Sequence, residues 1–371
     1  MSDGALQREV REVTDLATLR AEVQAAIDAE IALRARQLEP VGPETTLLVD
    51  AIADLLRGGK RLRAAFCYWG YRAADGRAAE ESIVKVATAM ELFQAAALIH
   101  DDVMDDSDTR RGMPAAHRRL ATVHADRDWD GEPDRFGLAG AILAGNLCLT
   151  WTDALFATSG LPTDELARAR PIFDEMRNQL MGGQFLDVLE SVRGWEDLGL
   201  VERLATSRQV IAYKSAKYSV EHPLLIGAAA AGLGATDLTE LSRFGLAVGE
   251  AFQLRDDLLG VYGDPEVTGK PAGDDLREGK RTVLMAYTLD GLGEQEADRF
   301  LDRLGRPDLG PDDVAWMREQ ITGSGAVTAV EADIAGLVDD ALAALGRTQG
   351  LVPHGRQALQ ELAHLATRRS S

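Results

Sequence analysis

Residues 83–106 read IVKVATAMELFQAAALIHDDVMDD, an apolar run that ends in a dense group of aspartates. Apolar residues recur at three- and four-residue steps from Ile83 to His100, which predicts a helix. Asp101 and Asp105 are four residues apart and therefore share one face of that helix. Because the C-terminal end of a helix carries partial negative charge, carboxylates are disfavoured there unless a cation offsets them. The stretch predicts a helix whose acidic end faces a cation.

Helical periodicity extends over nearly the whole chain, and the two-residue alternation of strands is scarce. We expect helices near residues 14–38, 44–57, 60–75, 79–106, 137–159, 163–193, 197–219, 236–262, 280–291, 311–322, 325–346 and 354–369. Segment 124–136 is charged and is predicted to be an exposed loop, and segment 262–279 a long ordered loop, which is often functional. Residues 1–13 are expected to be flexible, and 14–369 to form a single all-α domain.

The net charge of −20 over 371 residues excludes the basic surface of a nucleic-acid-binding protein. An anionic substrate would need cations concentrated at its site. The two cysteines, Cys67 and Cys148, lie in apolar helical patterns and indicate reduced thiols in a cytoplasmic protein. The polar N-terminus is not expected to be a signal peptide. The stretch 223–235 is too short for a transmembrane segment, and none is expected.

A second acidic group lies far along the chain. Residues 252–260 read FQLRDDLLG, so that Asp256 and Asp257 end another apolar helix. Each acidic helix end alone could be an ordinary solvated terminus, but two of them make that explanation weaker. Dense carboxylates suit Mg²⁺, which is usually held by a few carboxylates together with substrate phosphates. The pair predicts a diphosphate site that binds magnesium. Lys270 and Lys280 follow, and either could also be a solvated surface lysine.

Two basic groups supply cations for an anionic ligand. Residues 58–63 read GGKRLR at a predicted helix start, where Lys60 and Arg63 face the same way and free backbone N–H groups favour anions. Arg110 and Arg111 follow the first aspartates, and Arg is the side chain best shaped for two-point phosphate binding. The spacing of a P-loop is absent.

Together these strings resemble the trans-isoprenyl diphosphate synthases, the polyprenyl synthetase family, and are most similar to its bacterial geranylgeranyl diphosphate synthases. Six matching strings occur in the family's order: GGKRLR (58–63), DDVMD with RRG (101–105 and 110–112), GQFLD (183–187), YKS (213–215), FQLRDD (252–257) and GKPAGDDLREGK (269–280). The resemblance implies an isoprenoid-synthase-type bundle of antiparallel helices around a deep central cavity, assembled as a homodimer.

The resemblance also implies two substrates, isopentenyl diphosphate and an allylic diphosphate (dimethylallyl, geranyl or farnesyl), and a role for each matching residue. Three Mg²⁺ ions would be bound by Asp101, Asp105 and Asp256, supported by Asp102 and Asp257. The allylic diphosphate would be contacted by Arg110, Lys214 and Lys270. The isopentenyl diphosphate would be bound by Lys60, Arg63, Gln94 and Arg111, with Lys280 among the substrate-binding residues. Ser215 and Gln253 would lie near the developing allylic cation.

The chain departs from the family pattern at four positions. Gly260 stands where many members have a third aspartate, so metal binding by the second cluster would rest on Asp256 and Asp257. Gln94 stands where many bacterial members have histidine, Ala64 replaces a common proline, and Asn146 stands where aspartate is common.

Product length is predicted from the helix before Asp101, along which the growing tail should run. Ala96 and Ala97 stand where members that stop at fifteen carbons carry an aromatic residue. Phe93, one turn deeper, would then form the floor, and a helical turn of about 5.4 Å matches one further isoprene unit. This predicts geranylgeranyl diphosphate as product. If Phe93 is ordinary core, Ala89 and Met90 matter instead and longer products follow.

Other functions remain open at this point. A farnesyl-producing or longer-chain synthase differs only in product. A class I terpene cyclase shares the first aspartate motif, but it lacks the Lys60–Arg63 pair because it binds no second diphosphate. A non-catalytic subunit of a heteromeric synthase would be expected to have lost the aspartates.

Overall fold

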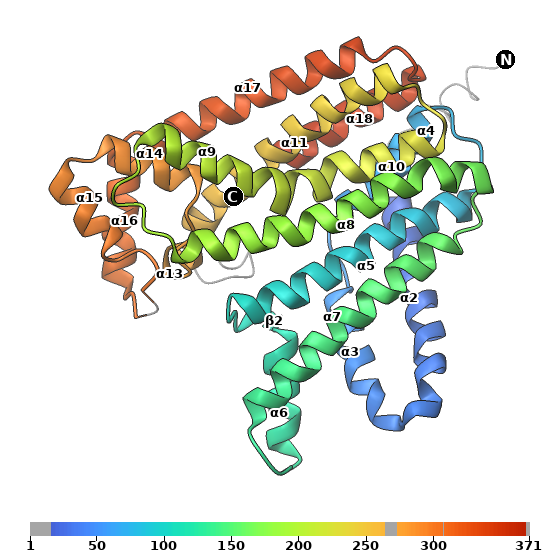
Figure 1. Cartoon of the computed structure of the whole chain (residues 1–371), viewed down its shortest axis with the longest axis horizontal. Helices are drawn as coiled ribbons and strands as arrows, with labels where there is room; N and C mark the ends of the chain where they lie inside the picture. The colour runs from blue at the N-terminus through green and yellow to red at the C-terminus, as the bar shows by residue number, and fades with distance from the viewer. Residues whose placement is uncertain (1–15, 264–272, 307, 369–371) are drawn as a thin grey trace. The chain divides into compact units, whose positions relative to one another are not determined.

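The computed structural model describes residues 16–263, 273–306 and 308–368, and these are helical almost throughout (Figure 1). The all-α prediction is confirmed, because the strands within these ranges are only two residues long. The expected flexible N-terminus lies outside the described residues.

The chain forms two compact units. The first comprises residues up to 173 with 223–238 and 349–362, and the second comprises 174–222, 239–348 and the residues from 363 onward. The unit boundaries fall inside four helices, α8 (Thr163–Val192), α10 (His222–Ala230), α11 (Ala235–Tyr262) and α18 (Pro353–Thr367). The single domain expected over residues 14–369 stays a prediction.

The remaining elements of the first unit are α2 (Leu16–Leu38), the 3-10 turns η1 (Glu39–Val41) and η2 (Pro43–Thr45), α3 (Thr46–Leu55), α4 (Leu62–Ala73), α5 (Glu80–Met104), β1 (Thr109–Arg110), β2 (Met113–Pro114), α6 (Ala116–Asp126) and α7 (Pro133–Ala157). The helix α10 (His222–Ala230) belongs to it apart from its first residue.

The remaining elements of the second unit are α9 (Leu200–Val210), the π-helix η3 (Ile211–Glu221), α13 (Asp274–Arg277), α14 (Val283–Gly291), α15 (Glu294–Leu301), α16 (Pro311–Gly323) and α17 (Ala326–Arg347). In this unit α14 packs against α9, α15, α16 and α17.

Helix α5 forms the core of the first unit, where it packs against α2, α4 and α7 (Figure 1). Most of its residues are buried. Helix α7 approaches closely because it carries small residues: a Cβ on Gly145 would lie only 2.2 Å from Nε2 of His100. His100 in turn lies 3.3 Å from the carbonyl oxygen of Ile142 and is a packing residue at this crossing. The tight packing fixes the direction of the helix that ends in the first aspartates.

Two of the described helices, α5 and α7, are long and apolar enough to cross a membrane by length and composition alone. Of the most apolar 18-residue window of α5, 78% is buried in the protein. Packing in the core therefore explains the apolar character of this helix. The corresponding share of α7 is 39%, and Ile142 and Leu143 on it are exposed. The bent pair α16 and α17 passes the same test only when taken together. The described residues contain no clear membrane span.

The structure differs from the predicted elements in three places. The segment 124–136 is not one loop, because α6 runs to Asp126 and α7 begins at Pro133, where proline fits the first helical position. The expected helix 197–219 consists of α9 followed directly by the π-helix η3, which ends at Glu221. Helix α15 was not predicted at all.

Candidate functional site

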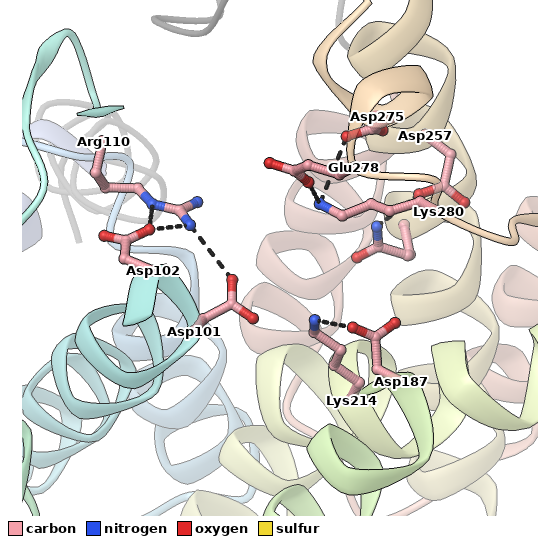
Figure 2. Close-up of polar contacts among 10 residues, drawn as sticks. Asp101, Asp102, Arg110, Asp187, Lys214, Asp257, Asp275, Glu278 and Lys280 are labelled. Carbon is pink, nitrogen blue, oxygen red and sulfur yellow. Dashed lines mark hydrogen bonds and ion pairs between the residues drawn. The ribbon is translucent and has the colours of Figure 1, made fainter. Parts of the chain in front are cut away.

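The first aspartate cluster lies at the end of α5. The helix ends at Met104, and Asp105 follows as the C-terminal cap. The Nε atom of Arg110 donates to Oδ1 of Asp102 at 2.7 Å, and its Nη2 donates to Oδ2 of Asp101 at 3.3 Å (Figure 2). Asp102 is buried. The sequence argument required a cation at this helix end, and Arg110 provides one.

A tight hairpin aims the two adjacent arginines in different directions. β1 and β2 pair with Arg110 opposite Met113, which leaves Arg111 and Gly112 as the two-residue turn. Their φ angles are 55° and 73°, the left-handed values that such turns require. While Arg110 contacts the aspartates, Nη1 of Arg111 donates to the carbonyl oxygen of Leu55 at 2.9 Å. The two guanidinium groups therefore contact different partners.

Two further arginines, Arg61 and Arg63, lie near the two arginines of this hairpin. The pKa of Arg111 is lowered, first by desolvation of its guanidinium group although part of the residue is exposed, and then by the positive charge of Arg61, with smaller contributions from Arg63 and Arg110. Glu91 opposes the shift. A Cβ on Gly59 would lie 3.3 Å from Nη1 of Arg111, so the GGKRLR and RRG strings meet in space. We call Arg61, Arg63, Arg110 and Arg111 the arginine cluster; it would be stabilised by an anion.

Sequence reasoning missed the buried pair that organises this region. Arg61 has a φ of 54° and caps the start of α4. Its Nη1 lies 3.2 Å from Oε2 of Glu91, and its Nη2 donates to Oε1 of Gln24 at 2.7 Å. The other oxygen of Glu91 accepts from the backbone N–H of Ala64 at 3.1 Å. Glu91 is the one acid between residues 83 and 100, and that isolated charge in an apolar helix was the available signal.

The other residues assigned from the GGKRLR string and α5 differ in exposure. Arg63 is buried, Lys60 is exposed, and Gln94 is half-buried one turn after Glu91. Phe93 and Ala96 are buried and Ala97 is half-buried. Burial suits Phe93 both as core and as the floor of a tail cavity, so its role in product length stays a prediction.

In the second unit, the YKS string lies in a π-helix of 11 residues. This helix is wider than an α-helix, and three glycines on neighbouring helices make room for it. A Cβ on Gly183 would lie 2.4 Å from the carbonyl carbon of Tyr213, and one on Gly249 would lie 2.6 Å from Cα of Ala216. Gly245 approaches Glu221 in the same way. Short π segments often mark functional sites.

The π-helix presents Lys214 to α8. The Nζ of Lys214 pairs with Oδ2 of Asp187, the last residue of the GQFLD string (Figure 2). The string had been recognised, but no role had been given to Asp187. Ser215, the next residue, is buried. The pair fixes the position of the lysine for which the family resemblance implies contact with a diphosphate.

The second aspartate cluster lies near the end of α11. Nε2 of Gln253 donates to Oδ1 of Asp257 at 2.8 Å, while Oδ2 of Asp257 is buried without a hydrogen-bond partner. Burial, together with the negative charges of Asp275 and Asp256, raises the pKa of Asp257 to about 8, and Gln253 and Lys280 oppose the shift. A buried carboxylate with one unsatisfied oxygen is a site that favours a cation.

Lys280 is held within the second unit by two carboxylates. Its Nζ lies 2.6 Å from Oε2 of Glu278 and 3.5 Å from Oδ1 of Asp275 (Figure 2). It is therefore not the solvated surface lysine that the sequence also allowed. The predicted site residue Lys270 lies outside the described residues.

Both aspartate clusters have the oxygen donors that Mg²⁺ prefers. The unsatisfied Oδ2 of Asp257 fits a cation, whereas Asp101 and Asp102 are paired with Arg110 in this structure. Within the described ranges, no group of three or more His, Cys, Asp or Glu residues is arranged as a ready-made metal site. Mg²⁺ usually keeps several waters and binds through one or two carboxylates plus substrate phosphates, so such a group is not required. The first cluster belongs to the first unit and the second to the other, and their joint action stays a prediction.

Comparison with protein families gives one match that covers most of the chain. Residues 45–321 match the family model described as polyprenyl synthetase. This range includes all the assigned aspartates, lysines and arginines.

Individual relatives agree with the match. A solved structure of geranylgeranyl pyrophosphate synthase from Corynebacterium glutamicum, complexed with isoprenyl diphosphate and magnesium, has a TM-score of 0.90 and 36% sequence identity; the alignment covers 96% of this chain and 100% of that one. The geranylfarnesyl diphosphate synthase of Aeropyrum pernix is 33% identical over 82% of this chain and 88% of its own. The geranylgeranyl diphosphate synthase of Sulfolobus acidocaldarius is 34% identical over 67% of this chain and 68% of its own.

Proposed function

Because the chain belongs to the polyprenyl synthetase family, we propose that it condenses isopentenyl diphosphate with an allylic diphosphate to make geranylgeranyl diphosphate. It is an enzyme of the trans-prenyltransferase class. The observation that carries the proposal is the arginine cluster beside the acidic end of α5. One surface there offers carboxylates for a metal-bound diphosphate and additional guanidinium groups for a second, metal-free diphosphate.

The allylic diphosphate belongs at the aspartates. Asp101, Asp105 and Asp256 would hold Mg²⁺, with Asp102 and Asp257 in support, and we take the number of ions to be three. When bound, Mg²⁺ offsets the negative charge of the departing diphosphate. Arg110 and Lys214, which now neutralise Asp101–Asp102 and Asp187, turn their donors to the diphosphate oxygens, and Lys270 joins them.

The isopentenyl diphosphate is assigned to the arginines of the cluster that do not contact the aspartates. Arg63 and Arg111 bind its diphosphate as multi-donor guanidinium groups, with Lys60 and Gln94 completing the site. Arg111 suits this role because it is partly desolvated and is repelled by its neighbours, so that an anion relieves the repulsion. Glu91 does not bind substrate here; it holds Arg61 and the start of α4 in place.

The chain's own groups then direct the condensation. The allylic C–O bond breaks, the double bond of isopentenyl diphosphate attacks the cation, and a proton leaves to the released diphosphate. Ser215 and Gln253 place oxygen dipoles near the cation, which favours its formation because such dipoles need no reorganisation. Gln253 is oriented by its bond to Asp257, and Ser215 by the π-helix.

Product length follows from α5. The small side chains of Ala96 and Ala97 leave room for the tail, and Phe93 closes it at twenty carbons. The relative that makes geranylfarnesyl diphosphate defines the alternative, a product one isoprene unit longer.

The assembly that fits the surface is a homodimer. Ile142 and Leu143 are 45% and 54% exposed on α7, and a second copy of this chain would cover them. Replacing both with glutamate should convert a dimer to a monomer in sedimentation experiments; an unchanged mass would reject this interface. Cys67 and Cys148 are buried and unpaired, in keeping with the cytoplasm, where we place the protein; recovery in the membrane fraction of lysed cells would contradict that placement.

The activity is tested with purified protein, Mg²⁺, isopentenyl diphosphate and farnesyl diphosphate. We expect consumption of isopentenyl diphosphate and a twenty-carbon product, and no reaction when the metal is removed with EDTA. Conversion of farnesyl or geranylgeranyl diphosphate without use of isopentenyl diphosphate would indicate a terpene cyclase. An inactive chain would indicate a regulatory subunit, and a dominant product of thirty or more carbons would reject the assigned chain length.

A further inference from the structure

Helix α6 carries a second pair of adjacent arginines, Arg118 and Arg119, a short distance along the chain from Arg110 and Arg111. Both lie in the first turn of the helix, where the helix dipole disfavours positive charge. That turn contains no acidic residue to offset the two cations. Such a conflict between a local rule and the sequence indicates that the arginines have partners elsewhere in the fold.

The backbone that carries the pair is fixed by close packing of α6 on α7 (Figure 1). A Cβ on Gly137 would lie 2.2 Å from the carbonyl oxygen of His117, and one on Gly140 would lie 2.6 Å from Cδ1 of Leu120. His117 and Leu120, which flank the two arginines, are buried. The arginine side chains therefore extend from a rigid base, and what they contact is held relative to α7.

Arg118 holds the loop that joins the first aspartate cluster to Arg110. Its Nη2 donates to Oδ1 of Asp106 at 3.0 Å, and its Nε donates to Oδ1 of Asp108 at 2.8 Å. Asp106 has a φ of 52°, so the chain turns sharply where Arg118 holds it. The Nη1 of Arg118 lies 3.5 Å from Oδ1 of Asp134 at the start of α7. One guanidinium group thus fastens the segment before Arg110 to both α6 and α7.

Arg119 points another way and holds the end of α3. Its Nη1 donates to the carbonyl oxygen of Asp50 at 3.1 Å and pairs with the carboxylate of Asp54. The same helix end presents the carbonyl oxygen of Leu55 to Nη1 of Arg111. Cations are favoured at the C-terminal end of a helix. Arg119 therefore fixes, relative to α6, the carbonyl group to which Arg111 donates.

We propose that Arg118 and Arg119 are positioning residues, one for each of the two diphosphate sites. Arg118 sets the place of Arg110 relative to the aspartates and so acts on the allylic diphosphate. Arg119 sets the place of Arg111 and so acts on isopentenyl diphosphate. Each acts through its neighbour and does not itself contact a substrate. This inference rests on the proposed function, because it divides the two substrates between the two arginines.

The contacts of Arg118 are too exposed to contribute much to folding. The carboxylates of Asp106, Asp108 and Asp134 are 78%, 79% and 77% exposed, and exposed ion pairs contribute little to stability. Loss of Arg118 should therefore leave the unfolding temperature close to that of the parent protein and change substrate binding instead.

The partner of Arg119 is also not left without a cation when Arg119 is replaced. Asp54 keeps Arg57, whose Nη1 lies 2.9 Å from its Oδ1. Loss of Arg119 therefore removes the connection between α6 and α3 without leaving an unpaired carboxylate, and its effect should again fall on binding rather than on folding.

The test measures binding to the full-length protein by calorimetry with two probes. Mg²⁺-dependent binding of inorganic pyrophosphate reports on the aspartate side, and binding of isopentenyl diphosphate in EDTA reports on the metal-free side. Arg118→Gln should weaken the first about tenfold and leave the second unchanged, and Arg119→Gln should do the reverse. Arg127→Gln, at the other end of α6, is the matched control and should bind both probes like the parent protein.

Steady-state kinetics gives a second readout that an ordinary structural role would not move. Arg118→Gln should raise KM for farnesyl diphosphate, and Arg119→Gln should raise KM for isopentenyl diphosphate, each about tenfold. Arg118→Lys and Arg119→Lys, which keep the charge, should each bind the affected probe more tightly than the glutamine variant.

The pattern of losses decides the proposal. Equal weakening of both probes by either glutamine variant, no weakening by either, or the same losses in Arg127→Gln would overturn it. Absence of prenyl transfer by the parent protein would reject the proposed function instead, and the titration with pyrophosphate and Mg²⁺ would still test the role of Arg118.

Discussion

The Nη1 atom of Arg61 lies 3.2 Å from Oε2 of Glu91, and the two side chains are only 3% and 2% exposed. This buried ion pair joins the start of α4 to the middle of α5, and the second oxygen of Glu91 caps α4 through the N–H of Ala64. The basic string 58–63 is therefore positioned by an acid on another helix.

Replacing Glu91 with glutamine should strongly destabilise the protein. It leaves the charge of Arg61 buried without its counterion, which typically costs about 3–5 kcal/mol. Urea unfolding measures the change. The matched control is Glu81→Gln, which removes an acid from the exposed Glu81–Lys85 pair on the same helix and should change little. Equal unfolding midpoints for the two variants would contradict a structural role for the buried pair.

Substitution of two adjacent glycines on α8 should have opposite effects. In Gly183→Ala the new methyl group meets the backbone of Tyr213, so we expect a loss of about 1–3 kcal/mol and slower prenyl transfer as Lys214 is displaced. In Gly182→Ala nothing lies within 4 Å, and alanine should stabilise the helix by up to about 1 kcal/mol. Thermal unfolding and turnover measure both. If the two variants behave alike, the close approach to the π-helix is not what position 183 requires.

Phe93→Ala should lengthen the products, because removing the ring opens the space below Ala96 and Ala97. Product chain length is read by chromatography after incubation with farnesyl diphosphate. Phe66→Ala is the control, since Phe66 is an equally buried phenylalanine of the first unit, on α4, to which no contact with the tail is assigned. Unchanged products from Phe93→Ala would make it a core residue without influence on length.

His222 should make the protein less stable in mild acid. Burial, with a smaller effect of Lys217, lowers the pKa of His222 to about 4, and its Nδ1 has no hydrogen-bond partner. In the unfolded chain His222 takes up a proton at its ordinary pKa near 6.5, so above that pH its burial costs the folded state nothing through protonation. As the pH falls toward 4, protonation favours the unfolded chain, and the free energy of unfolding decreases by about 3 kcal/mol at most.

Comparison with His222→Gln isolates this contribution from that of the many carboxylates. Unfolding midpoints measured between pH 7 and pH 4 should fall less steeply for the variant than for the parent protein. Parallel slopes would show that His222 does not take up a proton on unfolding.

Strong local periodicity made the fold predictable. The long apolar runs that became α5 and α11 had clear helical patterns and acidic ends, and both were placed within a few residues. Helix α6 was missed because its sequence, AHRRLATVHAD, is short and strongly charged, so its burial against α7 has little local signal. The π-helix at residues 211–221 could not be predicted from their own sequence, because the glycines that make room for it lie on other helices.

The candidate site was predictable where chemistry is concentrated in short strings. The arginines and aspartates of residues 101–111 were found in this way, and the structure brings Arg110 to Asp101 and Asp102. Glu91 and Asp187 were not singled out, since each acts on a residue distant in sequence. Their roles depend on tertiary contacts, which a string of residues does not record.

The π-helix has a consequence for how the chain tolerates changes of length. Deleting one residue from Ile211–Glu221 would let the segment relax to ordinary α-helical bonding, and each residue of register corresponds to about 100° of rotation. Such a deletion would turn Lys214 away from Asp187 or rotate all of α10, although it removes no assigned residue. Insertions and deletions should therefore be rarer in these 11 residues during evolution than in the neighbouring helix α9.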